Sequence, residues 1–140
     1  MTNANMKQGN KKGKRTYDAF MDKECIALCD CLNELPHIET EESCCGHLKE
    51  PFRIWFRCSS FTYLAIIARA INRQYAGTQQ VWRLQSVSTD VRPRFNFLLE
   101  SEKKYDTYEE MVADTKQIAD NIKYWKENFI DYFRSNNEVR

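Results

Sequence analysis

The sequence predicts an α+β fold in the order α-β-β-α-β-β-α, with helices packed on one face of a mainly antiparallel sheet. Three segments repeat their apolar residues with the helical period, and four shorter segments between them alternate apolar and polar residues. The chain has 140 residues, of which 42% are hydrophobic and 13% aromatic, enough for one core without disulfide bonds. We therefore expect a single domain over residues 17–140.

The first helix is expected over residues 18–35, where Pro36 ends it. Its polar side includes Asp22, and Cys31 lies off the apolar stripe. Cys25 and Cys29 belong to that stripe and are expected to act as small buried hydrophobes. The full stripe is Met21, Cys25, Leu28, Cys29, Leu32 and Leu35.

Two strands and a helix follow, at residues 37–42, 52–58 and 60–75. Ser59 or Ser60 can cap this second helix, and Gly77 is expected to end the unit. Two more strands are predicted at 80–88 and 94–100, joined by a polar connection with Asp90 and Pro93 as turn residues.

The last helix is predicted over residues 108–134. Thr107 and Glu110 fit the capping-box pattern at its start. If the apolar residues of the strands point towards the helices, the other sheet face is open and carries a set of polar and aromatic side chains: Arg53, Trp55, Arg57, Arg83, Gln85 and Asn96. This face can bind nucleic acid through Arg53, Trp55 and Arg57, pair its arginines with acids across strands, or form a homodimer.

Charge is unevenly distributed along the chain. Residues 1–16 carry five basic side chains and no acid, so the remainder has a net charge of 1 − 5 = −4. We expect residues 1–16 to be a disordered basic tail, which either keeps the protein in solution or contacts nucleic acid. No secretory signal or membrane-spanning run is visible, so we expect a cytoplasmic protein with six reduced cysteines and no membrane partner.

The segment SCCGHLKEP is expected to form a loop that binds a small anionic or nucleotide-like ligand. Gly46 allows a positive φ and a tight turn. Cys45 and His47 supply recognising or reactive groups, while Lys49 and Arg53 supply positive charge. The predicted ligand-binding residues are Ser43, Cys44, Cys45, Gly46, His47, Lys49 and Arg53.

Other interpretations of this loop remain open. A zinc site would use Cys44, Cys45 and His47 with a fourth ligand from His37, Cys31 or Cys58, but the C-x-x-C pair of zinc knuckles is absent, so no metal site is assigned. A thiol nucleophile would pair with His47, oriented by Asp90 or a loop acid. A structural turn within an interaction module is a further alternative. No catalytic residue or cofactor is assigned, and whether the protein is an enzyme stays open.

The residues ESCCGH followed by K-x-P-F-R-I-W-F resemble a motif in small uncharacterised proteins of phages and gut bacteria. The resemblance covers residues 38–56 and implies a shared loop in a protein of a mobile element or gut bacterium, without an activity. Thr40-x-x-Ser43-Cys44-x-Gly46 is also similar to a strand-end signature of the tRNA wybutosine-synthesising methyltransferase family. That resemblance implies chemistry on RNA or a nucleotide, although His47 stands where the family tends to carry an arginine.

Overall fold

The computed structural model describes residues 21–87 and 96–138, and side chains as far as residue 129. The basic segment 1–16 and the connection that holds Asp90 and Pro93 lie outside the described residues. The described part has three α-helices and one four-stranded antiparallel sheet, which confirms the predicted α+β fold.

The sheet has the strand order β1-β2-β4-β3, so the last two strands of the chain have exchanged places relative to a simple meander. β2 and β4 occupy the centre and pair antiparallel with each other, and β1 and β3 form the two edges. The strands are β1 (Ile38–Cys44), β2 (Pro51–Cys58), β3 (Trp82–Val87) and β4 (Asn96–Lys104).

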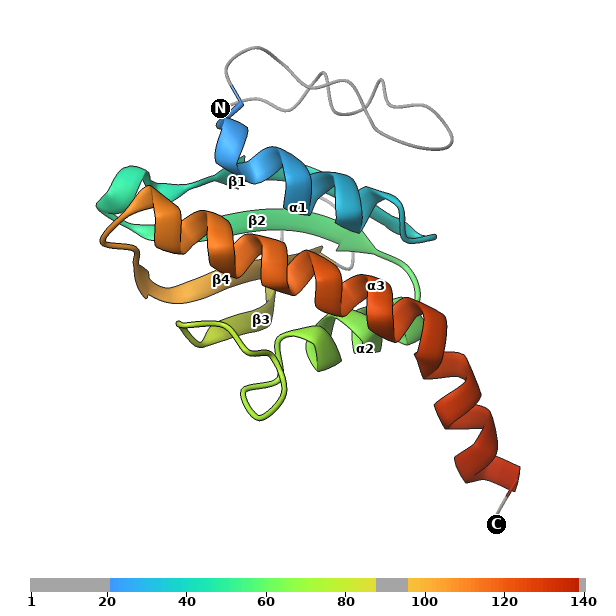
Figure 1. The fold of residues 1–140 in the computed structure, drawn as a ribbon. Helices are drawn as coiled ribbons and strands as arrows, with labels where there is room; N and C mark the ends of the chain where they lie inside the picture. Colours follow the sequence, from blue (N-terminus) through green and yellow to red (C-terminus); the bar gives the residue numbers. More distant parts are fainter. Residues whose placement is uncertain (1–20, 88–95, 139–140) are drawn as a thin grey trace.

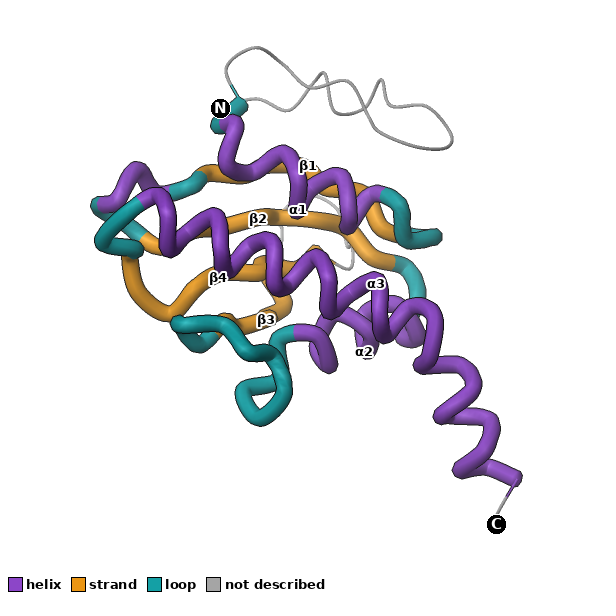
Figure 2. Tube along the Cα trace, in the orientation of Figure 1, coloured by secondary structure: helices purple, strands orange, loops and turns teal. Residues whose placement is uncertain are grey.

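The helices lie on one face of this sheet, as Figures 1 and 2 show. α1 and α3 run side by side over the sheet, roughly along the strands at an oblique angle, and α2 packs against α3 near the end of β2. The start of α3 lies beside the β1–β2 connection in Figure 1, while its C-terminal part extends beyond the sheet. The helices are α1 (Lys23–Asn33), α2 (Phe61–Ala70) and α3 (Tyr108–Glu138), and the β1–β2 connection contains the short turn η2 (Gly46–Leu48).

The alternation of β2 places its apolar residues under the helices. Phe52, Ile54 and Phe56 are completely buried there, and the stripe of α1 covers them with Cys25 and Cys29, which are also fully buried as predicted. Burial of large apolar side chains is the main favourable contribution to folding, at about 1.5–3 kcal/mol each. The core therefore lies between the sheet and the layer formed by α1 and α3.

A buried hydrogen-bond chain fixes the loop before β3 to α3. The Tyr105 hydroxyl accepts from Nε1 of Trp82 at 2.8 Å and donates to Oδ2 of Asp114 at 2.6 Å. The Asp114 carboxylate also accepts the backbone N–H groups of Gln79 and Gln80. These four hydrogen bonds satisfy the buried polar groups of Trp82, Tyr105 and Asp114.

Several element boundaries differ from the prediction. α1 begins at Lys23, with Asp22 as its N-cap. α2 ends at Ala70, and the next residue, Ile71, no longer has helical backbone angles. β1 extends to Cys44, so the connection to β2 is shorter than expected. Cys31 lies off the apolar stripe but is buried, because α3 covers that side of α1 and the Cys31 thiol reaches the carbonyl of Ala119.

The strand register confirms that the predicted residues share the sheet face turned away from the helices, but this face is not open: Arg53, Trp55 and Arg57 are half-buried and Asn96 is buried. Arg53, Trp55 and Arg57 of β2 point away from the helices. Their partners on β4 are, in the same order, Glu100, Leu98 and Asn96. On the other side of β4 these residues pair with Arg83, Gln85 and Val87 of β3. The arginines meet carboxylates: Arg57 contacts Glu39 and Glu41, Arg53 contacts Glu50, and Arg83 contacts Glu100. These contacts favour the cross-strand ion-pair interpretation of the face.

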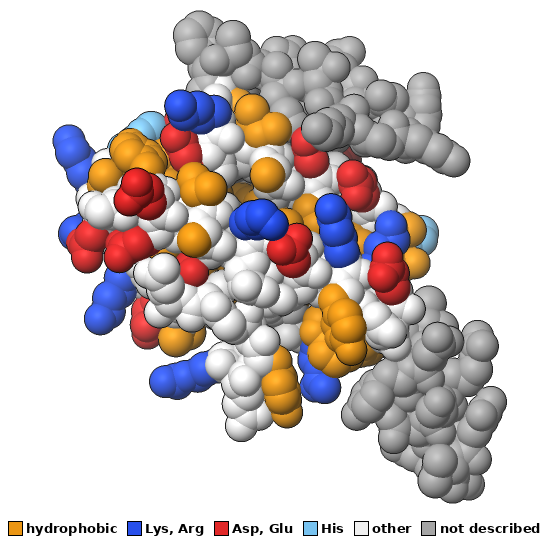
Figure 3. Space-filling view, viewed as in Figure 1, with side chains coloured by type: hydrophobic (Ala, Val, Ile, Leu, Met, Phe, Trp, Pro, Cys, Tyr) orange, Lys and Arg blue, Asp and Glu red, His pale blue; other side chains and the backbone are white. Residues whose placement is uncertain are grey.

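All six cysteines are free thiols. Among the helices in the described ranges, none combines the length and the apolar character that a membrane span requires. On the side of the molecule drawn in Figure 3, Lys and Arg side chains are interspersed with Asp and Glu, so the described part of this side has no continuous basic patch.

Candidate functional site

The predicted ligand-binding residues are divided between the two faces of the sheet. Ser43 is buried and faces the helices, whereas Cys44 faces the other side of the sheet, opposite Arg53. A β-bulge between Thr40 and Glu42 causes this arrangement, because one extra residue shifts every later side chain of β1 to the other face. Ser43, Cys44 and Arg53 therefore do not converge with Cys45 and His47.

The connection after Cys45 has an unusual backbone conformation. Gly46, His47 and Leu48 follow one another with φ values of 82°, 53° and 63°, all in the left-handed region. Glycine adopts this region readily, but the two side-chain-bearing residues are disfavoured there by about 1–2 kcal/mol each. The exposed Lys49 then closes the turn through a hydrogen bond from its N–H to the carbonyl of Gly46.

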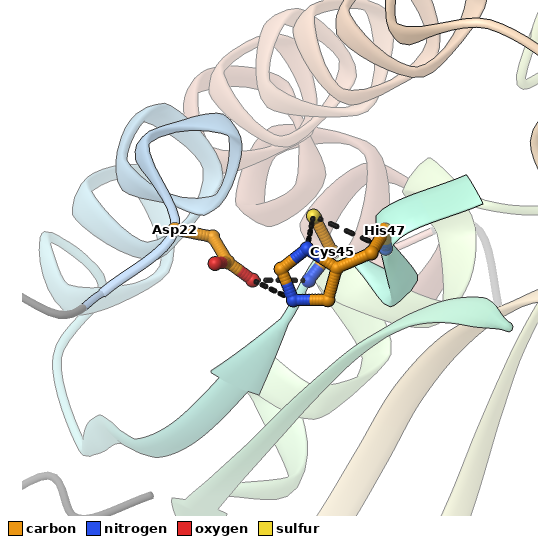
Figure 4. A group of neighbouring side chains, drawn as sticks. All are labelled: Asp22, Cys45 and His47. Atoms are coloured by element: carbon orange, nitrogen blue, oxygen red, sulfur yellow. Dashed lines mark hydrogen bonds and ion pairs between the residues drawn. The ribbon is translucent and has the colours of Figure 1, made fainter. Parts of the chain in front are cut away.

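Asp22 connects α1 to this turn. As the N-cap of α1 it would ordinarily accept a hydrogen bond from the first turn of its own helix, but its side chain makes no such bond. Its Oδ2 instead accepts the backbone N–H of Cys45 at 2.9 Å. The carboxylate is thus directed away from the helix and towards the connection between β1 and β2, as Figure 4 shows.

The imidazole of His47 lies between the Cys45 sulfur and the Asp22 carboxylate (Figure 4). Its Nδ1 is 3.7 Å from Sγ of Cys45, and its Nε2 is 3.5 Å from Oδ2 of Asp22. One donor atom from each of the three residues lies within 4.8 Å of the other two. The His47 side chain is 59% exposed, whereas Cys45 is only 1% exposed, so the ring covers the sulfur and is itself open to solvent.

The site has an acidic character. Burial and, to a smaller extent, the nearby Asp22 carboxylate together raise the pKa of the Cys45 thiol to about 12, against a hydrogen bond from the N–H of His47 that lowers it. Tyr108, at the start of α3, has its pKa raised by desolvation and then by electrostatic interaction with Cys45, Glu24 and Asp22, of which the two carboxylates are already charged at pH 7. A positive ion is therefore favoured here over a free anion, and the Cys45 thiol is neutral at pH 7.

Three kinds of chemistry can be compared at this site. A thiolate nucleophile requires an accessible sulfur with a lowered pKa, and Cys45 has neither property. An anion cradle requires free backbone N–H groups, but the N–H groups of Cys45, Gly46 and His47 already donate to the Asp22 carboxylate, the Cys44 sulfur and the Cys45 sulfur, respectively. Thiolate, imidazole and carboxylate are the groups by which proteins bind zinc.

The separation of the sulfur and the ring nitrogen suits a bound metal ion. Zinc bonds of about 2.3 Å to sulfur and about 2.05 Å to nitrogen span the 3.7 Å between Sγ and Nδ1 at an angle of about 115°, close to the tetrahedral value of about 109°. The two atoms therefore lie at a separation that a single ion can bridge.

The other predicted metal ligands lie elsewhere. Cys44 is on the opposite side of β1, Cys31 faces α3, and Cys58 is at the far end of β2, where its thiol contacts the carbonyl of Ser60. His37 lies near Tyr63. Sequence analysis assigned no metal site and placed Asp22 on the polar side of the first helix. Its position immediately before that helix indicates a cap, and no sequence signal connects it to His47.

A small apolar cavity lies at the far end of β2, away from the β1–β2 connection. Few polar groups face it, so it offers little with which to orient a polar ligand. Its lining residues are Cys58, Ser59, Ser60, Phe61, Leu64 and Phe97.

Comparison of the chain with protein-family models, with curated proteins and with solved structures finds no match. The resemblance of residues 38–56 to phage and gut-bacterial proteins, and that of Thr40–Gly46 to the wybutosine-synthesising family, therefore stay predictions. The function is therefore inferred from the side chains of the described residues. Among them, Asp22, Cys45 and His47 form a cluster of potential metal ligands.

Proposed function

We propose that the protein binds a divalent transition-metal ion of the zinc type at the β1–β2 connection, through Cys45 and His47, with Asp22 as the third member of the site. The observation that carries this proposal is the 3.7 Å separation of Sγ and Nδ1, which two zinc bonds can span at a near-tetrahedral angle.

The surroundings of the site support a cation. The Asp22 carboxylate touches both the backbone of Cys45 and the ring of His47, and Glu24 adds negative charge nearby. A bound ion would also remove the obstacle to forming the thiolate, because the metal would displace the thiol proton, which is released to solvent. Sulfur and nitrogen ligands favour zinc over magnesium or calcium, which prefer oxygen.

The strained turn has a function in this proposal. Three successive left-handed residues hold the His47 ring over the sulfur before any ion is present. Such strain is found where the surrounding structure fixes a geometry needed for binding. The anionic small ligand expected from the sequence would then meet a positive ion rather than the acidic turn itself.

Calorimetric titration of reduced, metal-free protein with Zn²⁺ tests the proposal. We expect one ion per chain, and Cys45→Ala and His47→Ala are expected to weaken binding by at least about a hundredfold. Cys44→Ala is the matched control, because Cys44 is the neighbouring thiol on the opposite side of β1. Absence of binding by the unaltered protein, or an equal loss in the Cys44 and Cys45 variants, would show that this site does not hold the ion.

A further inference from the structure

The position of Asp22 decides how many coordination sites the ion would offer. Its Oδ2 lies 3.5 Å from Nε2 of His47, whereas Sγ of Cys45 faces the other ring nitrogen, Nδ1. A carboxylate beside one imidazole nitrogen keeps the proton on that nitrogen and leaves a lone pair on the other. The lone pair of His47 is therefore directed towards the sulfur.

The same carboxylate oxygen already has two partners. It accepts the N–H of Cys45 at 2.9 Å and contacts the His47 ring. Coordination of the ion by Asp22 would have to compete with both contacts, and one of them fixes the backbone of Cys45 itself. The arrangement is that of a carboxylate supporting a metal-bound histidine from its outer nitrogen.

We infer that Asp22 is a positioning residue for His47 and not a ligand, so an ion held by Cys45 and His47 offers two adjacent coordination positions to a small bidentate anion such as a dicarboxylate. This inference rests on the proposed function. A tetrahedral ion with two protein ligands has two positions left. The His47 side chain is 59% exposed, so a small anion from solvent can reach an ion bound to its ring.

Cobalt(II) is a suitable probe, because its absorption reports both a thiolate ligand and the coordination number. Asp22→Asn keeps an oxygen that accepts from Nε2 of His47 and from the N–H of Cys45, but an amide is a poor metal ligand. We expect this variant to bind Co²⁺ within about tenfold of the unaltered protein, with the same spectrum. Asp22→Ala removes the support and is expected to bind about 10–100-fold more weakly.

The outcomes separate the two proposals. If the unaltered protein does not bind Co²⁺, the proposed function fails. If it binds, but Asp22→Asn is as weak as Asp22→Ala or has an altered spectrum, Asp22 is a ligand and this inference is overturned. Thermal unfolding of each metal-free variant shows whether a variant that binds weakly is also unfolded. If Asp22→Ala is unfolded, its affinity is not used, and the Co²⁺ spectrum of Asp22→Asn alone decides whether Asp22 is a ligand.

Titration of the cobalt-loaded protein with oxalate and with acetate tests the two open positions. A bidentate anion gains from its second contact being intramolecular. We therefore expect oxalate to change the cobalt spectrum to saturation at a concentration at least about tenfold lower than acetate, while the thiolate absorption is retained. Equal concentrations, an unchanged spectrum, or loss of the thiolate absorption through removal of the ion would each overturn the inference.

Discussion

The backbone N–H of Cys45 donates to the carboxylate of Asp22 at 2.9 Å, joining two residues 23 positions apart in the chain. This bond links the start of α1 to the connection between β1 and β2. It brings a carboxylate, a thiol and an imidazole together at one edge of the helical layer. The chemistry proposed for the protein depends on this link, and the following predictions test its surroundings.

Gly46→Ala is expected to destabilise the protein strongly. A Cβ at this position would lie 2.7 Å from the carbonyl oxygen of Pro51, and the residue has a φ of 82°. The clash is with backbone, which cannot move aside, so we expect a loss of about 2–4 kcal/mol in the free energy of unfolding, measured with urea.

Gly77→Ala is the matched control for that variant. Gly77 also has a positive φ, of 74°, but its nearest neighbour for a Cβ is the flexible Gln117 side chain at 3.7 Å. Only the conformational cost applies, and we expect about 1–2 kcal/mol. Equal losses in the two variants would show that the close approach of Gly46 to Pro51 does not contribute.

His47→Gly should separate binding from stability. Glycine adopts the left-handed conformation of this position without the penalty that a side chain meets, and the ring is exposed, so little packing is lost. In the metal-free state we expect His47→Gly to be more stable than His47→Ala by about 1 kcal/mol in urea unfolding. Both variants are expected to lose the proposed Zn²⁺ binding. A His47→Gly protein that is less stable than His47→Ala would contradict the assignment of strain to this turn.

Tyr105→Phe tests the buried hydrogen-bond chain. The substitution removes the acceptor of the Trp82 indole N–H and a donor to Asp114, leaving buried groups without partners. We expect a loss of about 1–3 kcal/mol in the free energy of unfolding. Tyr108→Phe, at an exposed position of α3, serves as the control and should change stability by less than about 0.5 kcal/mol. A Tyr105→Phe protein with unchanged stability would mean that these bonds contribute nothing net.

The Cys45 thiol of metal-free protein is expected to react slowly at neutral pH. Burial raises its pKa to about 12, so the reactive thiolate is scarce at pH 7 and increases as the pH approaches that value. In the unfolded state the Cys45 thiol has a pKa near 9, so between about pH 9 and pH 12 the thiol is protonated in the folded state and deprotonated in the unfolded state. As a result, stability decreases as the pH rises from about 9 to about 12.

Alkylation with iodoacetamide, followed by mass spectrometry of the peptides, measures this difference. Cys44 is the internal comparison, because it is adjacent in sequence and more exposed. Modification of Cys45 as fast as Cys44 at pH 7 would revive the nucleophile hypothesis.

Nucleic-acid binding by residues 1–16 stays a prediction. Replacement of Lys7, Lys11, Lys12, Lys14 and Arg15 by glutamine should abolish salt-dependent retention on single-stranded RNA, because phosphate contacts depend on positive charge. The matched variant Arg53→Gln/Arg57→Gln should retain it, since both arginines contact carboxylates of the protein. The opposite pattern would identify the sheet face turned away from the helices as the binding surface. Sedimentation of the same proteins tests the predicted homodimer.

The sequence by itself determined the α+β fold, the burial of Cys25 and Cys29, and the placement of Arg53, Trp55 and Arg57 on the sheet face turned away from the helices. Each of these follows from the spacing of side chains within one helix or strand, which periodicity reports directly. The sequence also indicated Gly46 as the residue that allows a tight turn, because only glycine adopts its φ without cost.

Only the tertiary structure decided which groups meet. The bulge in β1 turns Ser43 inwards and Cys44 outwards, and a bulge of one residue leaves no regular trace in the apolar pattern. Asp22 reaches Cys45 and His47 because α1 packs across the sheet with its first residue above the β1–β2 connection. Periodicity describes neighbours within an element, whereas contacts between elements depend on how they pack, so the carboxylate of the candidate site could not be found from the sequence.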